Sequence, residues 1–261
     1  RDPETVTIDQ GDAGPDIEQR LYEVADGSRK LDALVDLLVT QRPEAAIVFC
    51  NTRNDTRDVA ESLDRCGFSV LALHGELDQR ERDEMLVRFA NRSCTVLVAT
   101  DVAARGLDIK ELPMVVNFDV ASDADAHIHR IGRTGRAGAR GLAITLTTPR
   151  ESSRIGAIAE RMGQPRQRQP LPQVNGKPRP LLSTHLTIAV DGGRADKLRP
   201  GDLLGALTGD AGLPGDAVGK IDIFPTRSYV AITRNHAETA LQRLREGKIK
   251  GRSFRVRRIG H

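Results

Sequence analysis

Apolar residues follow two different spacings between residues 21 and 163. Short continuous runs such as AAIVFC at 45–50 are typical of strands buried on both faces. Apolar residues at every third or fourth position indicate one face of a helix. These patterns predict helices over residues 29–40, 53–65, 79–90, 123–131 and 150–162, and strands over residues 45–50, 70–73, 95–99, 114–118 and 142–147.

Strands that alternate with helices predict an α/β domain, in which a parallel sheet has helices on both faces. Ligands of such sheets bind beyond the carboxyl ends of the strands. The polar segments Asn51-Thr52-Arg53, His74-Gly75 and Thr100-Asp101 follow three of the predicted strands. Their placement predicts a binding site along one edge of the sheet.

A different order of elements follows residue 183. Strands are predicted over residues 185–190, 218–224, 228–233 and 252–258, and helices over residues 200–208 and 235–246. The order βαββαβ in fewer than 80 residues is the ferredoxin-like arrangement of RNA-recognition (RRM) domains. We therefore expect a second, smaller domain over residues 184–261.

Two polar segments frame these domains. Residues 1–20 show no sustained period, which predicts a linker or edge segment before a first domain over residues 21–163. Residues 164–183 are rich in proline and arginine, which predicts an extended linker. Residues 1–165 hold 21 Lys+Arg and 28 Asp+Glu (net −7), whereas residues 166–261 hold 18 and 8 (net +10). The second domain is therefore the better candidate to bind a polyanion.

The composition favours one cellular compartment for the protein. No run of 18 apolar residues exists, and the charged segment Arg1-Asp2-Pro3-Glu4 has no apolar signal-peptide region. The three cysteines lack metal-ligand spacing, and Cys50 and Cys94 lie in or beside apolar runs, which favours buried reduced thiols. We expect a cytoplasmic protein with no membrane contact and no metal site of its own.

The densest cluster of candidate chemistry is HIHRIGRTGRAGA, residues 127–139, with three arginines and three glycines. Glycines let a backbone turn tightly, and a guanidinium can fork onto phosphate oxygens. Arg133 and Arg136 therefore suit the negative charge that develops on a transferred phosphoryl group. A solvated basic loop is the alternative for such a segment taken alone.

Together with its neighbours, this cluster resembles a known family. ATDVAARGLDI (99–109) and HRIGRTGRAG (129–138) are similar to motifs V and VI of the DEAD-box RNA helicases. AIVFCNTR resembles motif IV of the family, and residues 79–82 match its QxxR motif. The resemblance implies that the first domain is RecA-like, with ATP and Mg²⁺ as cofactors.

The resemblance also implies roles for individual residues. ATP binding is expected from Gly106, Asp108, Arg133 and Arg136, with His129, Arg133 and Arg136 catalytic. Coupling between domains is expected from Gln79, Arg82 and Arg105, and contact with the RNA backbone from Thr52, Arg53, Gly75, Thr100 and Asp101.

Simpler roles stay open for four of these motif residues. Asp108 could cap a turn, and His74 and His129 could be structural. Arg82 could pair with acidic neighbours in its own helix.

Two motifs of the family are missing. The chain contains no GxxxxGK[ST] phosphate loop and no Asp-Glu-Ala-Asp sequence. In the family both belong to a first RecA-like domain, which also supplies the Mg²⁺ ligands. We therefore expect that this chain begins at the interdomain linker, lacks that N-terminal domain, and is inactive by itself.

The second domain resembles the RNA-binding domain of the bacterial DbpA helicases, from residue 191 to the end of the chain. This resemblance implies recognition of a hairpin of 23S ribosomal RNA. Only Tyr229 is aromatic at the positions where RRM domains stack bases. The expected RNA-binding residues of this domain are Tyr229, Lys248, Lys250, Arg252, Arg255, Arg257 and Arg258.

The sequence thus predicts the C-terminal part of an ATP-dependent RNA helicase that remodels 23S rRNA in precursors of the large ribosomal subunit. One alternative is a non-catalytic RNA-binding adaptor, which would have no use for Arg133 and Arg136. Another is a fragment of a cold-shock helicase of the DeaD/CsdA type. Those helicases carry a long basic tail after the related domain, and this chain has none.

Overall fold

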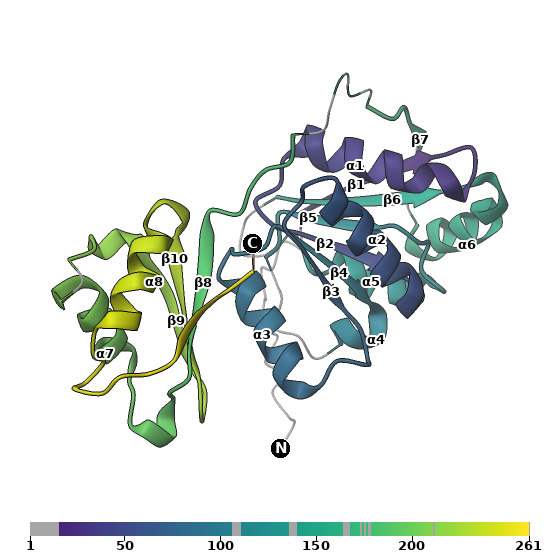
Figure 1. Cartoon of the computed structure of the whole chain (residues 1–261). Coiled ribbons are helices and arrows are strands. Elements are labelled where there is room, and N and C mark those ends of the chain that lie inside the picture. The colour runs from purple at the N-terminus through teal and green to yellow at the C-terminus, as the bar shows by residue number, and fades with distance from the viewer. Residues whose placement is uncertain are drawn as a thin grey trace, which may run out of the picture.

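Two sheets organise the computed structural model, which describes residues 16–105, 111–135, 140–163, 168–172, 174, 176, 179–210 and 212–260 (Figure 1). The larger sheet belongs to the first domain and has the strand order β3-β4-β2-β5-β6-β1-β7. All its pairings are parallel. Its strands are β1 (Ile17–Glu23), β2 (Ala46–Cys50), β3 (Val70–Leu73), β4 (Val96–Thr100), β5 (Met114–Asn117), β6 (Gly141–Thr147) and β7 (Arg168–Gln169).

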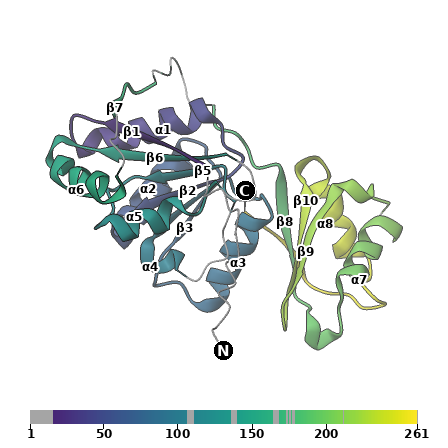
Figure 2. The same cartoon turned by 180° about the vertical axis from the view of Figure 1, so that it is seen from behind.

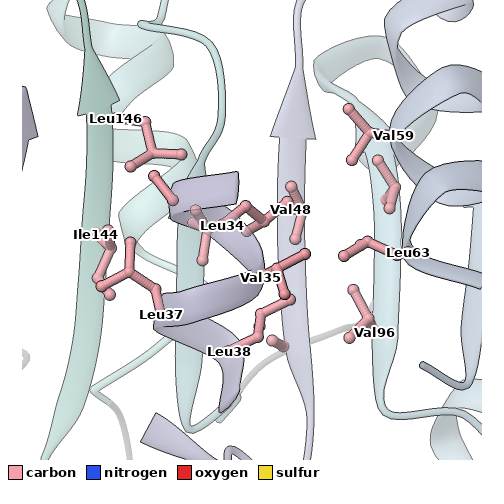
Figure 3. Packing of buried hydrophobic residues seen from close by; sticks show 14 of the residues in the cluster. Leu34, Val35, Leu37, Leu38, Val48, Val59, Leu63, Val96, Ile144 and Leu146 are labelled. Carbon is pink, nitrogen blue, oxygen red and sulfur yellow. The ribbon is translucent and has the colours of Figure 1, made fainter. Parts of the chain in front are cut away.

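Helices cover both faces of this sheet, as predicted. They are α1 (Lys30–Gln41), α2 (Arg53–Arg65), α3 (Gln79–Ala90), α4 (Asp101–Ala104), α5 (Ala124–Ile131) and α6 (Ser152–Met162), with 3-10 turns at Gly27–Arg29 and Pro149–Glu151. Residues of α1 and α2 pack on one side of β2, and residues of α3 and α4 pack on the other. Figure 3 shows Leu34 and Leu37 of α1 directed at Val48, Ile144 and Leu146 of the strands. Alternate residues of β2 serve the two cores, because successive side chains of a strand point to opposite faces.

The strand β1 corrects one sequence prediction. It begins at Ile17, inside the stretch 1–20 predicted as a linker or edge segment, and pairs along its full length with β6. Only the two-residue strand β7 lies outside it in the sheet. The segment IEQRLYE has no continuous apolar run, and it becomes a strand because β6 supplies its hydrogen-bonding partner more than 100 residues away.

The second domain has the predicted βαββαβ order. Its antiparallel sheet has the order β11-β8-β10-β9, formed by β8 (His185–Val190), β9 (Val218–Ile223), β10 (Ser228–Thr233) and β11 (Val256–Ile259). Helices α7 (Pro200–Gly205) and α8 (Ala237–Glu246) pack on one face. A π-turn at Ala206–Asp210 and 3-10 turns at Arg194–Asp196, Gly215–Ala217 and Arg234–His236 complete the domain.

The last strand is shorter than the predicted 252–258. A tight turn joins Ile249 to Arg252, with Lys250 at φ 52° and Gly251 at φ 76°, so β11 begins only at Val256. This left-handed turn is not evident from the predicted strand pattern. Within the described residues, no helix is long and apolar enough to cross a membrane.

Candidate functional site

A pocket of about 550 Å³ opens at the carboxyl edge of the larger sheet. Its lining includes Asp101 at the start of α4 and Arg105 at its end, together with His129 and Arg130 of α5 and Arg133 in the turn that follows. The two motif segments, about 30 residues apart in sequence, therefore meet around one cavity. The segments that follow β2, β4 and β5 all leave the parallel sheet at this edge, and α5, which follows β5, carries His129 and Arg130 to it.

Arg130 forms the floor of this pocket and is 1% exposed. Its Nε and Nη2 each donate to the Asp101 carboxylate at 2.7 Å. Nη1 donates to the carbonyl of Asp119 at 2.6 Å, and Nη2 also donates to Asn51 Oδ1 at 2.8 Å. The guanidinium lies 5.3 Å from the centre of the Phe49 ring. The Arg130 side chain, which belongs to α5, is thus hydrogen-bonded to residues that follow β2, β4 and β5.

The turn after α5 holds Arg133 at the pocket. The carbonyl of Arg133 accepts a hydrogen bond from the Leu112 N–H at 3.0 Å. Thr134 is buried, and its hydroxyl donates to the Leu112 carbonyl. Gly135 follows with φ 71°, and a Cβ there would lie 2.5 Å from Ile17 Cγ1. Only glycine fits this position, because a larger residue would collide with Ile17 at the start of β1.

The ionisable side chains on the pocket lining differ in burial and pairing. Asp101 neutralises Arg130, whereas His129 and Arg105 are exposed on the lining. Asp123 caps α5 by accepting a hydrogen bond from the Ala126 N–H at 2.8 Å, and this backbone bond lowers the pKa of the Asp123 carboxyl. The pocket lining therefore combines the buried Arg130–Asp101 pair with the side chains of Arg105, His129 and Arg133 and with the carboxylates of Asp123 and Asp125.

The predicted RNA-contact residues lie along the same edge of the sheet. Thr52 caps α2 through its hydroxyl oxygen, which accepts from the Asp55 N–H at 3.1 Å. Thr100 caps α4 in the same way, accepting from the Ala103 N–H at 3.3 Å. Both threonines stand at helix N-termini, where unpaired N–H groups favour anionic ligands.

Arg53 directly follows the Thr52 cap, and its side chain is hydrogen-bonded to Glu76, the residue after Gly75. Its Nη1 donates to one oxygen of Glu76 at 2.9 Å, and the other oxygen of Glu76 accepts from Arg57. His74, on the preceding position, is buried and accepts a hydrogen bond from Arg57 Nε at 3.4 Å. Burial, followed by the charge of Arg57, lowers the pKa of His74.

Two of the three predicted coupling residues, Gln79 and Arg82, occupy the first turn of α3, and the third, Arg105, caps the end of α4. Gln79 donates to Asp83 at 2.7 Å within the helix. Arg82 donates through Nη2 to the carbonyls of Ala103 (2.9 Å) and Arg105 (3.4 Å). Its acidic neighbours Asp78 and Glu81 instead form a reciprocal capping box of α3. Arg82 thus connects α3 to the end of α4, next to the pocket, in place of pairing within its own helix.

The basic residues of the second domain differ in how they are paired. Ion pairs connect Lys250 with Asp202 (3.5 Å), Arg252 with Asp196 (3.8 Å), Arg258 with Glu238 (3.7 Å) and Arg257 with Glu84 (3.0 Å). Lys248 and Arg255 are exposed and form no ion pair with another described residue. These two side chains are the most available for a phosphate.

Tyr229 requires a correction. Its side chain is 2% exposed and packs in a cluster with Val87, Ala189 and Ile259, and its ring meets Phe224 edge-on at 5.5 Å. A base cannot stack on a ring that is covered in this way, so the predicted RNA contact of Tyr229 is not available in this arrangement. The sequence gives no sign of this burial, because Val87 belongs to the other domain.

Comparison with known proteins agrees with this geometry. The family described as "Helicase conserved C-terminal domain" matches residues 29–138, and "DbpA RNA binding domain" matches residues 187–258. The solved structure of the E. coli DEAD-box protein SrmB, bound to regulator of ribonuclease activity A, is 36% identical. It superimposes with a TM-score of 0.56, over 63% of this chain and 94% of that one. The chain belongs to the DEAD-box RNA helicases.

Two curated DEAD-box relatives match almost the whole chain. The ATP-dependent RNA helicase DbpA of Escherichia coli (strain K12) is 49% identical over 257 residues, which are 98% of this chain and 56% of the relative. Its namesake from Bacillus subtilis (strain 168) is 30% identical over 92% of this chain and 54% of the relative. The chain therefore spans about half the length of these relatives.

Family motifs V and VI thus line one pocket of the helicase domain, although three of their predicted ATP-binding residues lie outside the described residues: Gly106, Asp108 and Arg136. Arg130, which forms most of the contacts in this pocket, was not among the residues predicted for the site. The local pattern gives little sign of this role, because Ile128 near it is exposed while Ile131 is buried, and an arginine in a basic motif is easily taken for a ligand contact.

Proposed function

We propose that this chain is the C-terminal part of an ATP-dependent RNA helicase that remodels 23S rRNA in precursors of the large ribosomal subunit, in the cytoplasm. The observation that carries the proposal is the pocket that gathers Arg105, His129 and Arg133 around the buried Arg130–Asp101 pair, with Asp123 and Asp125 also on its lining. Cations fixed on a cavity wall suit the charge of a transferred phosphoryl group.

The donor set fits the phosphate end of ATP. Arg133 and Arg136 would hold its terminal phosphate and Asp108 its ribose, with Gly106 as a further ATP contact. When bound with Mg²⁺, ATP would supply the phosphoryl group that is transferred to water, with ADP as the leaving group. Among the described residues, no group of three or more His, Cys, Asp or Glu could hold a metal ion. The Mg²⁺ ligands and phosphate loop are therefore assigned to the remaining part of the full-length protein, since the relatives are nearly twice as long.

The residues of this chain have two tasks in the proposed reaction. Arg133 would neutralise the transferring group from the pocket wall, and His129 would help to orient it. The RNA backbone would lie along the carboxyl edge of the sheet, next to the predicted contact residues Thr52, Arg53, Gly75, Thr100 and Asp101. Arg82 links the two regions through the carbonyls of Ala103 and Arg105, so a shift of α4 on ATP binding would reach α3.

The second domain is proposed to bind a 23S rRNA hairpin through its basic residues, with Lys248 and Arg255 foremost. The match to the DbpA RNA-binding domain over residues 187–258 supports an RNA ligand. The net charge of +10 on residues 166–261 supports a phosphate-rich one.

Hairpin-stimulated ATP hydrolysis tests the proposal. The full-length product of the gene should hydrolyse ATP when the hairpin transcript is added, and a scrambled hairpin should stimulate it far less. The 261-residue chain alone should bind the hairpin without ATP turnover above background. A full-length protein that binds the hairpin yet never hydrolyses ATP would instead be the non-catalytic adaptor.

A further inference from the structure

One face of the second domain's sheet is buried by the first domain. Even-numbered residues of β8, β10 and β11, such as Ile188, Val230 and Val256, form the core under α7 and α8. Odd-numbered residues point the other way, yet Thr187, Ala189, Tyr229 and Ile259 are 0–4% exposed. Figure 1 and Figure 2 show α3 lying beside this sheet in both views.

The apolar part of this contact is formed by Val87 of α3. Val87 clusters with Ala189, Tyr229 and Ile259, one residue from each of three strands, and belongs to none of the other apolar clusters. Its side chain therefore packs against the second domain and adds little to the core of the helicase domain. Such a contact is an interdomain interface.

Polar bonds set the register of this interface. Ser93 and Thr187 share a buried hydroxyl–hydroxyl bond of 2.6 Å. The His185 N–H donates to the Arg92 carbonyl at 3.4 Å. At the other side, Arg257 Nη2 donates to Glu84 at 3.0 Å. Apolar surfaces can slide past one another, but these directional bonds at both ends define a single position.

The same helix serves both domains. The first turn of α3 carries Gln79 and Arg82, and Arg82 contacts α4 beside the pocket. The following turns carry Glu84 and Val87, which hold the second domain. A helix of this length spans roughly 18 Å and does not bend without a proline or bulge. The distance between the RNA edge and the second domain is therefore set by a rigid element.

We propose that the RNA-binding domain is a fixed spacer and not a flexible tether, so that the chain selects RNAs by the distance between the hairpin and the strand that the helicase domain grips. This inference rests on the proposed function. A domain free on the linker 164–183 would accept many spacings, because effective concentration falls only slowly with length in a flexible connection. A docked domain accepts only those RNAs whose spacer bridges one distance.

The first test measures docking without RNA. Spin labels at one exposed site in each domain report the interdomain distance distribution of the 261-residue chain. The wild type should give one narrow distribution. Val87→Glu places a carboxylate in the buried cluster, and Glu84→Arg faces Arg257 with a like charge, so both variants should give broad distributions. The double variant Glu84→Arg/Arg257→Glu should restore the narrow one, and Glu61→Arg on exposed α2 should leave it unchanged.

The second test uses RNA. The probe is the hairpin transcript joined to a single strand by uridine spacers of increasing length, bound to the same proteins. The wild type should prefer one spacer length by about tenfold or more over shorter and longer ones. The undocked variants should bind the bare hairpin as well as the wild type, with less than about threefold variation across the series.

The outcomes separate this inference from the function on which it rests. A broad interdomain distance distribution in the wild type would overturn the fixed-spacer proposal alone. So would an affinity that does not vary with the length of the uridine spacer while binding of the bare hairpin is intact. Absence of hairpin binding overturns the proposed function, while the distance measurement still decides whether the domains are docked. Thermal unfolding of each variant shows whether the folded helicase domain is retained.

Discussion

The guanidinium of Arg130 and the carboxylate of Asp101 meet through two hydrogen bonds of 2.7 Å in the floor of the pocket. Arg130 is almost fully buried, whereas the Asp101 side chain keeps 29% of its exposure. The pair neutralises one of the three motif VI arginines, so that Arg130 builds the site while Arg133 remains on the wall. Two arginines three residues apart therefore have different tasks.

Arg130→Met is expected to lower the free energy of unfolding by about 3–5 kcal/mol, because it leaves Asp101 without its partner and removes the bonds to Asn51 and Asp119. Urea unfolding measures the change. Arg140→Met is the matched control, since Arg140 pairs with Glu18 at the surface and should contribute about 0–1 kcal/mol. Equal losses in the two variants would refute a structural role for Arg130.

Arg133→Ala in the full-length protein is expected to reduce RNA-stimulated ATP hydrolysis by about 10³–10⁵, the effect typical of losing an arginine finger. Affinity for the hairpin should not change, because the residue lies in the helicase domain pocket. Steady-state hydrolysis and hairpin titration measure the two effects. A variant with near wild-type kcat would exclude Arg133 from the reaction.

Replacing Lys248 and Arg255 together by Gln is expected to weaken hairpin binding and to flatten the log–log salt dependence by about one to two units. Both side chains are exposed and lack ion pairs among the described residues, so their charges are available to phosphates. Titrations at several salt concentrations give the slope. The same double change at Arg29 and Arg65 of the helicase domain is the control, and an equal effect there would assign the salt dependence to overall charge.

Tyr229→Leu is expected to change hairpin affinity by less than the ~1–3 kcal/mol of a stacked base, because the ring is covered by α3. The substitution should instead loosen the contact with Val87 and broaden the preference for spacer length. Hairpin titration with and without a joined single strand separates the effects. A full stacking loss on the bare hairpin would mean that RNA displaces α3 from the sheet.

Stability is expected to fall as the pH drops below 6.5, the ordinary pKa of histidine, because burial depresses the pKa of His74 in the folded chain. The unfolded chain then binds more protons than the folded one, so the contribution of His74 is complete above 6.5 and is lost below it. His185 is shifted in the same direction for the same reason. Urea unfolding across this range should give a shallower pH slope for His74→Gln. An unchanged slope would assign the effect to other groups.

The sequence by itself determined the elements that local patterns specify. The continuous apolar run of β2 and the amphipathic spacing of α2 and α3 gave their positions to within one residue. Parallel topology then placed the polar segments after β2, β3 and β4 at one edge. These inferences succeed because burial on one or two faces leaves a period in the chain itself.

Only the tertiary structure decided what depends on distant partners. The strand β1 forms because β6 lies beside it, and Arg130 is structural because Asp101 and Asn51 surround it. Tyr229 is covered because Val87 packs on it, and Ser93 meets Thr187 across 94 residues. Such contacts leave no period in the sequence, since each side looks like an ordinary surface or strand residue until the other is in place. The buried sheet face of the RNA-binding domain therefore followed from packing between domains, which no local pattern encodes.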